Sequence, residues 1–131
     1  MAVAAPRVLV ADDARVMRRL VRTWLERLGC VVLEAGSGTE ALAIATREPL
    51  DAALFDSHMP GLTGLQVLET LRGDARTRGL PVVIITTLGH ASDVERGLKV
   101  GATAYLTKPL GYSEFYRALL VVLPELARRG R

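Results

Sequence analysis

Three aspartates are the residues of this chain best placed to do chemistry, because each directly follows an apolar run. Asp12 and Asp13 come after the run Arg7–Ala11. Asp56 comes after the run Ala52–Phe55. Continuous apolar runs are typical of strands that are covered on both faces of a parallel sheet. Since the carboxyl ends of such strands form the ligand-binding edge, we expect the three carboxylates to lie close together.

Two further polar residues occupy comparable places later in the chain. Thr86 ends the apolar run Val82–Thr86. Lys108, followed by Pro109, comes after the run Ala102–Leu106. The same edge of the sheet should therefore also carry a hydroxyl and an ammonium group.

This set of groups indicates phosphoryl chemistry that depends on a divalent cation. Two like charges ~4 Å apart repel by about 4 kcal/mol at an effective dielectric constant of 20, so the acidic cluster needs a cation. Lys108 offers one positive charge against three negative ones. Carboxylate oxygens with open water positions favour Mg²⁺, which commonly joins one or two carboxylates to a phosphate. A carboxylate can attack phosphorus to form an aspartyl phosphate, whose oxygens a lysine and a threonine hydroxyl can stabilise.

The elements that must position these groups alternate regularly. Five short apolar segments are expected to form strands, with helical patterns between them: Arg7–Ala11, Val31–Ala35, Ala52–Phe55, Val82–Thr86 and Ala102–Leu106. A strand–helix order repeated in this way predicts an α/β fold. Its sheet is parallel, its crossovers are right-handed and its helices cover both faces.

The helical segments carry signals for their faces and ends. An apolar stripe at helix spacing, followed by Gly29 as a stop, marks the first one: Met17, Leu20, Val21, Trp24, Leu25 and Leu28. Capping boxes, in which two side chains reciprocally bond free amides, predict three further helix starts: Ser37 with Glu40, Thr63 with Gln66, and Ser92 with Glu95. The last helix should begin near Tyr112 or Ser113 and end or kink at Pro124.

Length and composition limit the remaining possibilities. The chain has 131 residues, of which 50% are hydrophobic and 24% charged, as expected of one globular domain. Its N-terminus lacks the charged start and long apolar stretch of a signal peptide, and no apolar run could span a bilayer. We therefore expect a cytoplasmic protein without a membrane segment. The net charge of +3 comes from arginines spread along the chain, which favours a solvated surface and makes nucleic-acid binding unlikely.

The chain resembles the response-regulator receiver domains, in particular the single-domain chemotaxis type. The matching residues are Asp12-Asp13, the run Asp56–Gly64, Thr86 and Lys108-Pro109. The resemblance implies a flavodoxin-like, five-stranded parallel sheet in the order 2-1-3-4-5. It also implies a single receiver domain over residues 1–131, with a core from about 7 to 123.

The resemblance further assigns a role to each matching residue. Asp56 is the phosphoacceptor, and Asp12, Asp13 and Asp56 hold Mg²⁺ together with the backbone carbonyl of His58. Thr86 is the switch hydroxyl, and Lys108 pairs with the phosphoryl group, the Lys108-Pro109 bond being cis. Tyr105 matches an aromatic switch residue on the fifth strand.

Simpler structural roles stand beside these assignments. Asp13 could cap the first helix, Tyr105 could be an ordinary core residue, and His58 could be a surface residue of a loop. Trp24 is expected in the core, and Cys30 is expected to be a small buried apolar residue.

The function implied is that of a two-component response regulator, not of a turnover enzyme. Asp56 would accept a phosphoryl group from the phosphohistidine of a sensor histidine kinase or a phosphotransfer protein. The modification would then switch a surface formed by the fourth helix, the fifth strand and the fifth helix. That surface would bind a downstream target protein or form a homodimer, because the last helix is too apolar to face only the sheet: Phe115, Tyr116, Leu119, Leu120, Val121, Val122 and Leu123. Alternatively, the tail covers the end of this helix.

Three other interpretations remain open from the sequence. The chain could be a small phosphohydrolase with an aspartate nucleophile, although no general acid or substrate-capping insertion is evident. It could be a basic nucleic-acid-binding module, although only 5% of its residues are aromatic. It could also be the receiver fragment of a larger regulator or of a hybrid kinase.

Overall fold

The computed structural model describes residues 4–87 and 91–128, except the side chains of residues 91–94, 97 and 128. The strands are β1 (Arg7–Ala11), β2 (Val31–Ala35), β3 (Ala52–Asp56), β4 (Val82–Thr87) and β5 (Ala104–Lys108). The helices are α1 (Arg15–Arg27), α2 (Gly38–Arg47), α3 (Gly64–Arg72), α4 (Ala91–Val100) and α5 (Tyr112–Val122), followed by a 3₁₀ helix at Pro124–Arg128. The predicted alternation of strands and helices is confirmed.

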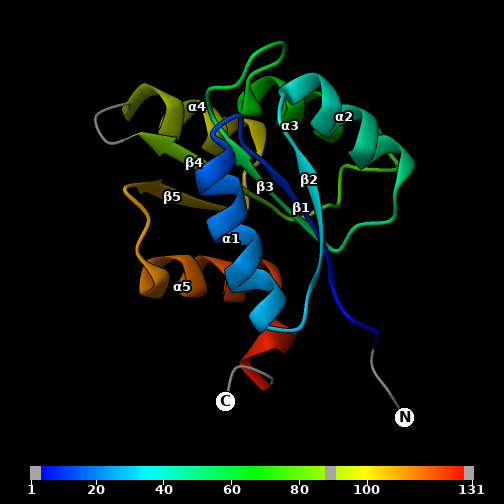
Figure 1. The fold of residues 1–131 in the computed structure, drawn as a ribbon. Helices are drawn as coiled ribbons and strands as arrows, with labels where there is room; N and C mark the ends of the chain where they lie inside the picture. The colour runs from blue at the N-terminus through cyan, green and yellow to red at the C-terminus, as the bar shows by residue number, and fades with distance from the viewer. Residues whose placement is uncertain (1–3, 88–90, 129–131) are drawn as a thin grey trace.

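All neighbouring strands pair in parallel, and their order is β2-β1-β3-β4-β5. The α/β fold and the strand order 2-1-3-4-5 are therefore as predicted. Figure 1 shows α1 and α5 on one face of the sheet and α2, α3 and α4 on the other. The central strands β1, β3 and β4 contribute alternate side chains to both apolar cores, which explains their continuous apolar sequences.

The fifth strand differs from its predicted position by two residues. The run Ala102–Leu106 suggested the strand, but β5 is Ala104–Lys108. Pairing with β4 decides its bounds, because Ala104 lies opposite Val83 and Lys108 lies opposite Thr87. Lys108 is thus the last residue of the strand, and hydrogen bonding to β4 continues beyond the apolar run.

The first helix ends as predicted, but its apolar stripe is narrower. Val21 and Leu25 are buried, and Trp24 packs half-buried against the same core. Leu20 does not belong to this face, since 39% of its surface is exposed. Gly29 has a φ of 89°, a left-handed conformation that glycine adopts readily just beyond a helix end.

Of the predicted capping boxes, one is complete and one is half formed. The Thr63 hydroxyl accepts from the Gln66 amide at 3.1 Å, and the Gln66 side chain accepts from the Thr63 amide at 2.9 Å. Ser37 accepts from the Glu40 amide, but the Glu40 carboxylate accepts from the amide of Gly36 instead of that of Ser37. The third predicted box, Ser92 with Glu95, cannot be followed because the side chain of Ser92 lies outside the described ones.

The C-terminal segment covers part of the apolar fifth helix. The predicted start near Tyr112 and end before Pro124 are both confirmed. Leu126 of the 3₁₀ helix is fully buried against the α1–α5 core, so the tail does close the end of α5. Val121 nevertheless keeps 56% of its surface exposed. In the described ranges, no helix has the length and apolar character needed to cross a membrane.

Candidate functional site

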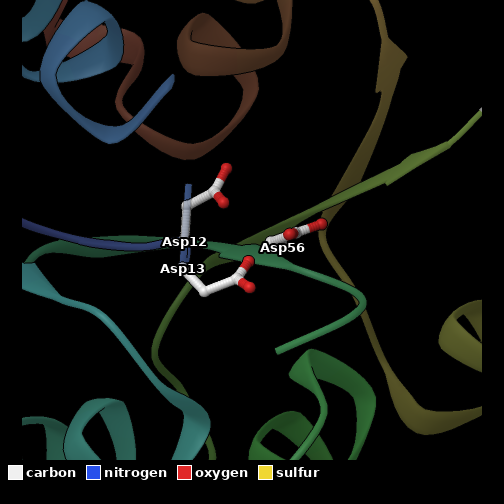
Figure 2. A group of neighbouring side chains, drawn as sticks. All are labelled: Asp12, Asp13 and Asp56. Atoms are coloured by element: carbon white, nitrogen blue, oxygen red, sulfur yellow. The ribbon is translucent and has the colours of Figure 1, made fainter. Parts of the chain in front are cut away.

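The three predicted carboxylates meet at one edge of the sheet. Asp12 and Asp13 follow β1, and Asp56 ends the neighbouring strand β3 (Figure 2). One carboxylate oxygen from each of these three residues lies within 4.8 Å of the other two. The prediction that the three carboxylates lie close together is therefore confirmed.

Burial and like charge act together on the central carboxylate. Asp56 is only 5% exposed. Its pKa lies above the usual value for aspartate, because burial disfavours the charged form and the charge of Asp12 adds to that effect. Lys108 and the backbone amide of His58 oppose the shift by stabilising the carboxylate, but they do not reverse it.

Lys108 connects the two buried carboxylates. Its Nζ atom lies 3.4 Å from Oδ2 of Asp12 and 3.4 Å from Oδ2 of Asp56. Burial by itself would lower the pKa of the Lys108 ammonium group, but the two carboxylates outweigh that effect and raise it. The lysine therefore stays charged beside the acidic group. The Lys108-Pro109 bond that precedes α5 is cis, as predicted.

The acidic cluster has the donor atoms that a hard divalent cation needs. Oδ1 of Asp12 accepts from the Ala14 amide at 2.9 Å. Oδ2 of Asp12 is buried and accepts no hydrogen bond from the described part of the chain, since Lys108 is near but not in hydrogen-bond geometry. Buried polar atoms are almost always satisfied, and a cation held by the three carboxylates would satisfy this one. The residues present thus fit Mg²⁺.

The hydroxyl that the sequence predicted to be the switch lies on the strand next to β3. Thr86 is buried on β4, and its Oγ1 atom accepts a hydrogen bond from the Ser57 hydroxyl at 3.2 Å. Sequence reasoning gave Ser57 no role. Its only signal was its position directly after Asp56, because the contact with Thr86 depends on the pairing of β3 with β4.

Arg18 was also missed, and the prediction that the arginines form a solvated surface is wrong at this position. The Arg18 guanidinium donates to the backbone carbonyl of Asp12 at 2.7 Å and to the Glu34 carboxylate at 2.8 Å. Burial alone would raise the pKa of Glu34, but hydrogen bonds from Arg22 and Arg18 together lower it. Arg18 thus ties the acidic loop after β1 to the edge strand β2.

The remaining predicted residues lie around this centre. Asp13 is exposed, and Ala14 is the N-cap of α1, so the alternative that Asp13 caps the helix is wrong. His58 is exposed, and its backbone amide stabilises the Asp56 carboxylate, while the role of its carbonyl as a Mg²⁺ ligand stays a prediction. Tyr105 is half-buried against the core beneath α2 and α3. Cys30 is buried, as expected.

Comparison with known proteins decides the family. The family model described as "Response regulator receiver domain" matches residues 8–120. The chain belongs to the response regulator receiver domains. As a receiver domain it is the phosphorylatable signalling module of two-component response regulators, and the phosphohydrolase alternative is not favoured.

Single-domain response regulators are among the similar proteins. The receiver domain is 37% identical to protein PilH of Pseudomonas aeruginosa, over 89% of this chain and 97% of that protein. It is also 37% identical to the chemotaxis protein CheY1 of Helicobacter pylori, over 89% and 96% of the two chains.

Solved structures show the same fold. The chemotaxis response regulator CheY4 of Vibrio cholerae superposes with a TM-score of 0.84 at 30% identity, covering 91% of this chain and 99% of the other. The receiver domain of the sensor histidine kinase PA1611 from Pseudomonas aeruginosa has a TM-score of 0.81 at 29% identity, covering 89% and 96%. That structure has a magnesium ion coordinated in its active site cleft.

Proposed function

We propose that this receiver domain accepts a phosphoryl group on Asp56 from the phosphohistidine of a sensor histidine kinase or a phosphotransfer protein. The observation that supports this most is the placement of Asp56 between Lys108 and the acidic pair Asp12-Asp13. A carboxylate oxygen of Asp56 attacks phosphorus while the bond from phosphorus to the histidine nitrogen breaks. The electron pair of that bond stays on the leaving imidazole.

The residues around Asp56 have distinct tasks in this step. Asp12, Asp13, Asp56 and the His58 carbonyl would hold Mg²⁺, which neutralises phosphoryl oxygens when it is bound. Lys108 supplies a further positive charge, directly beside the acceptor oxygen. The Thr86 hydroxyl donates to a phosphoryl oxygen once the group is attached. The domain catalyses only its own phosphorylation and dephosphorylation, and is therefore a switch and not a turnover enzyme.

The output surface lies on α4, β5 and α5. A groove of about 470 Å³ runs between β5 and α5, and its lining includes Tyr105, Pro109, Arg117 and Val121. Tyr105 thus borders both the core and this groove. A change in the position of Thr86 on β4 would reach the groove through the neighbouring strand β5. We propose that a downstream target protein binds there, with a homodimer as the second possibility, and that residues 1–131 act as a single cytoplasmic domain.

Phosphorylation by a small phosphodonor tests the assignment. Wild-type protein incubated with phosphoramidate and Mg²⁺ should gain one phosphoryl group by intact-protein mass spectrometry. Asp56→Asn should gain none, and Asp12→Ala should gain it more slowly. Asp74→Asn is the matched control, because Asp74 pairs with Arg76 on the surface and is not part of the acidic cluster. Undiminished labelling of Asp56→Asn would refute the assignment, and light scattering of labelled protein separates a monomer from a dimer.

A further inference from the structure

Ser57, which directly follows the proposed phosphoacceptor, is fixed in place by its backbone. Its amide donates to the Ile85 carbonyl on β4 at 2.8 Å. Its carbonyl accepts from the amide of Gly64, the first residue of α3, at 3.2 Å. The residue is 1% exposed. The main chain of Ser57 therefore cannot move unless β3 or the start of α3 moves as well.

The Ser57 hydroxyl is directed at the switch threonine. It donates to Oγ1 of Thr86 at 3.2 Å, and both residues are buried. The strand register places Asp56 opposite Ile85, so Thr86 lies beside Ser57 and not beside the acid. Within the described ranges, the Asp56 carboxylate is stabilised by Lys108 and the His58 amide, and Thr86 is not among its partners.

Thr86 cannot keep its hydrogen bond to Ser57 and also reach a phosphoryl group on Asp56, which is its switched position. For Oγ1 of Thr86 to reach a phosphoryl group on Asp56, it has to turn away from Ser57. The turn breaks the buried hydrogen bond that the Ser57 hydroxyl donates, and breaking a buried hydrogen bond costs more than losing an exposed one. Only the switched state bears this free-energy cost, because the hydrogen bond between Ser57 and Thr86 is kept in the resting state.

We propose that Ser57 is a positioning residue that holds Thr86 in its resting orientation and so sets how readily the domain switches. The inference rests on the proposed roles of Asp56 and Thr86. Ser57 need not touch the phosphoryl group, because it acts through the Thr86 hydroxyl. Removing the Ser57 hydroxyl should make the switched state easier to reach, although the reacting groups are unchanged.

Binding of a phosphoryl mimic measures this effect. Beryllium trifluoride with Mg²⁺ can occupy an aspartate as a phosphoryl group does, and its dissociation constant can be obtained by titration calorimetry. Ser57→Ala should bind the mimic about fivefold more tightly than wild type, the factor that corresponds to one ordinary hydrogen bond. In a Thr86→Val background, which lacks the hydroxyl, adding Ser57→Ala should leave the dissociation constant unchanged.

Thr77→Val is the matched control for the loss of a buried hydroxyl. Thr77 is also buried, and its Oγ1 atom donates to the Leu71 carbonyl at 2.7 Å, with no part in the acidic site. Its removal should lower the free energy of unfolding but leave the affinity for the mimic unchanged. This control shows whether losing any buried hydroxyl changes the affinity for the mimic, or only losing the hydroxyl that bonds Thr86.

The rotamer of Thr86 can be measured in wild-type protein, so this test does not depend on whether any variant folds. Three-bond carbon couplings of the Thr86 methyl group report its χ1 rotamer, which should change when wild-type protein binds the mimic. An unchanged Thr86 rotamer overturns the inference. So does a Ser57→Ala variant that binds the mimic no more tightly than wild type. A gain in affinity that Ser57→Ala still produces in the Thr86→Val background overturns it as well. If wild-type protein binds no mimic, or if Asp56→Asn binds it equally well, the proposed function fails and the inference fails with it.

Discussion

Gly64 lies in direct backbone contact with Asp56. A Cβ atom built on Gly64 would overlap the carbonyl oxygen of Asp56 and would lie 3.2 Å from Cα of Ser57. The first turn of α3 thus packs against the end of β3 at the residue that carries the proposed acceptor carboxylate. Only a residue without a side chain permits this approach, so the position of Asp56 depends on a glycine eight residues later in the sequence.

Gly64→Ala should therefore damage both stability and phosphorylation. The added methyl group meets backbone atoms that cannot rotate away, so we expect a loss of about 1–3 kcal/mol in the free energy of unfolding. The displaced Asp56 should also accept a phosphoryl group more slowly. Urea unfolding and labelling with phosphoramidate measure the two effects.

Gly79→Ala is the control for that substitution. No described heavy atom lies within 4 Å of a Cβ built on Gly79, and its φ lies outside the left-handed range. Its free energy of unfolding should stay the same or rise slightly, since alanine restricts the unfolded chain. If Gly64→Ala and Gly79→Ala changed the free energy of unfolding equally, the contact between Gly64 and Asp56 would contribute nothing to stability.

Asp56→Asn should stabilise the protein at neutral pH when Mg²⁺ is absent. The pKa of Asp56 is raised by burial and by Asp12, so the folded state holds its proton more tightly than the unfolded state does. This contribution to stability is present below the unfolded pKa of about 3.9 and is lost as the pH rises through the folded pKa. The gain in the free energy of unfolding from Asp56→Asn should be present at pH 7 and should shrink towards pH 4.

Urea unfolding at the two pH values measures this gain. Glu69→Gln removes a carboxylate from an exposed position of α3 and should show no such gain. Mg²⁺ at a hundredfold excess over its dissociation constant should stabilise wild type by about 2.7 kcal/mol, and the variant by less. A gain of the same size at pH 4 and pH 7 would contradict the assigned cause.

Lys108→Met should separate phosphoryl transfer from metal binding. Methionine retains most of the length of the side chain but not the charge that lies 3.4 Å from Asp56. We expect labelling by phosphoramidate to slow about a hundredfold, since an electrostatic contact to the transferred group is lost. The affinity for Mg²⁺ should not fall, because a competing positive charge is gone. Lys99→Met, at the only other lysine of the chain, should leave both quantities unchanged.

Arg18→Ala should destabilise the protein much more than Arg19→Ala. The Arg18 side chain is 17% exposed and bonds both Glu34 and the Asp12 carbonyl. The Arg19 side chain is 58% exposed and reaches Glu34 only at 3.9 Å. We expect losses of about 2 kcal/mol and less than about 0.5 kcal/mol in the free energy of unfolding, respectively.

At acidic pH, Arg18→Ala and Arg19→Ala should differ less in their free energy of unfolding. The pKa of Glu34 is lowered in the folded protein, so its contribution to stability is present above the unfolded value of about 4.3 and is lost as the pH falls through the folded pKa. Urea unfolding at pH 7 and pH 3 measures the change. A difference that does not depend on pH would place the effect of Arg18 in its bond to the Asp12 carbonyl alone.

Much of the active-site edge could be predicted from the sequence. Local signals carry that information: an apolar run followed by Asp56 predicts the end of a buried strand, and Thr63 with Gln66 predicts the start of α3 from four consecutive residues. Because carboxyl ends of parallel strands share one edge, these local signals were enough to bring Asp12, Asp13 and Asp56 together.

Tertiary structure alone decided which atoms of different elements meet at that edge. Hydrogen bonding to β4 extends β5 to Lys108, and the same kind of pairing sets Ser57 beside Thr86. Packing of α1 on the sheet buries Arg18 against Glu34 and leaves Leu20 exposed, although an apolar stripe predicted the reverse for Leu20. Periodicity along a chain specifies which residues form an element, whereas register and packing between elements specify which atoms meet.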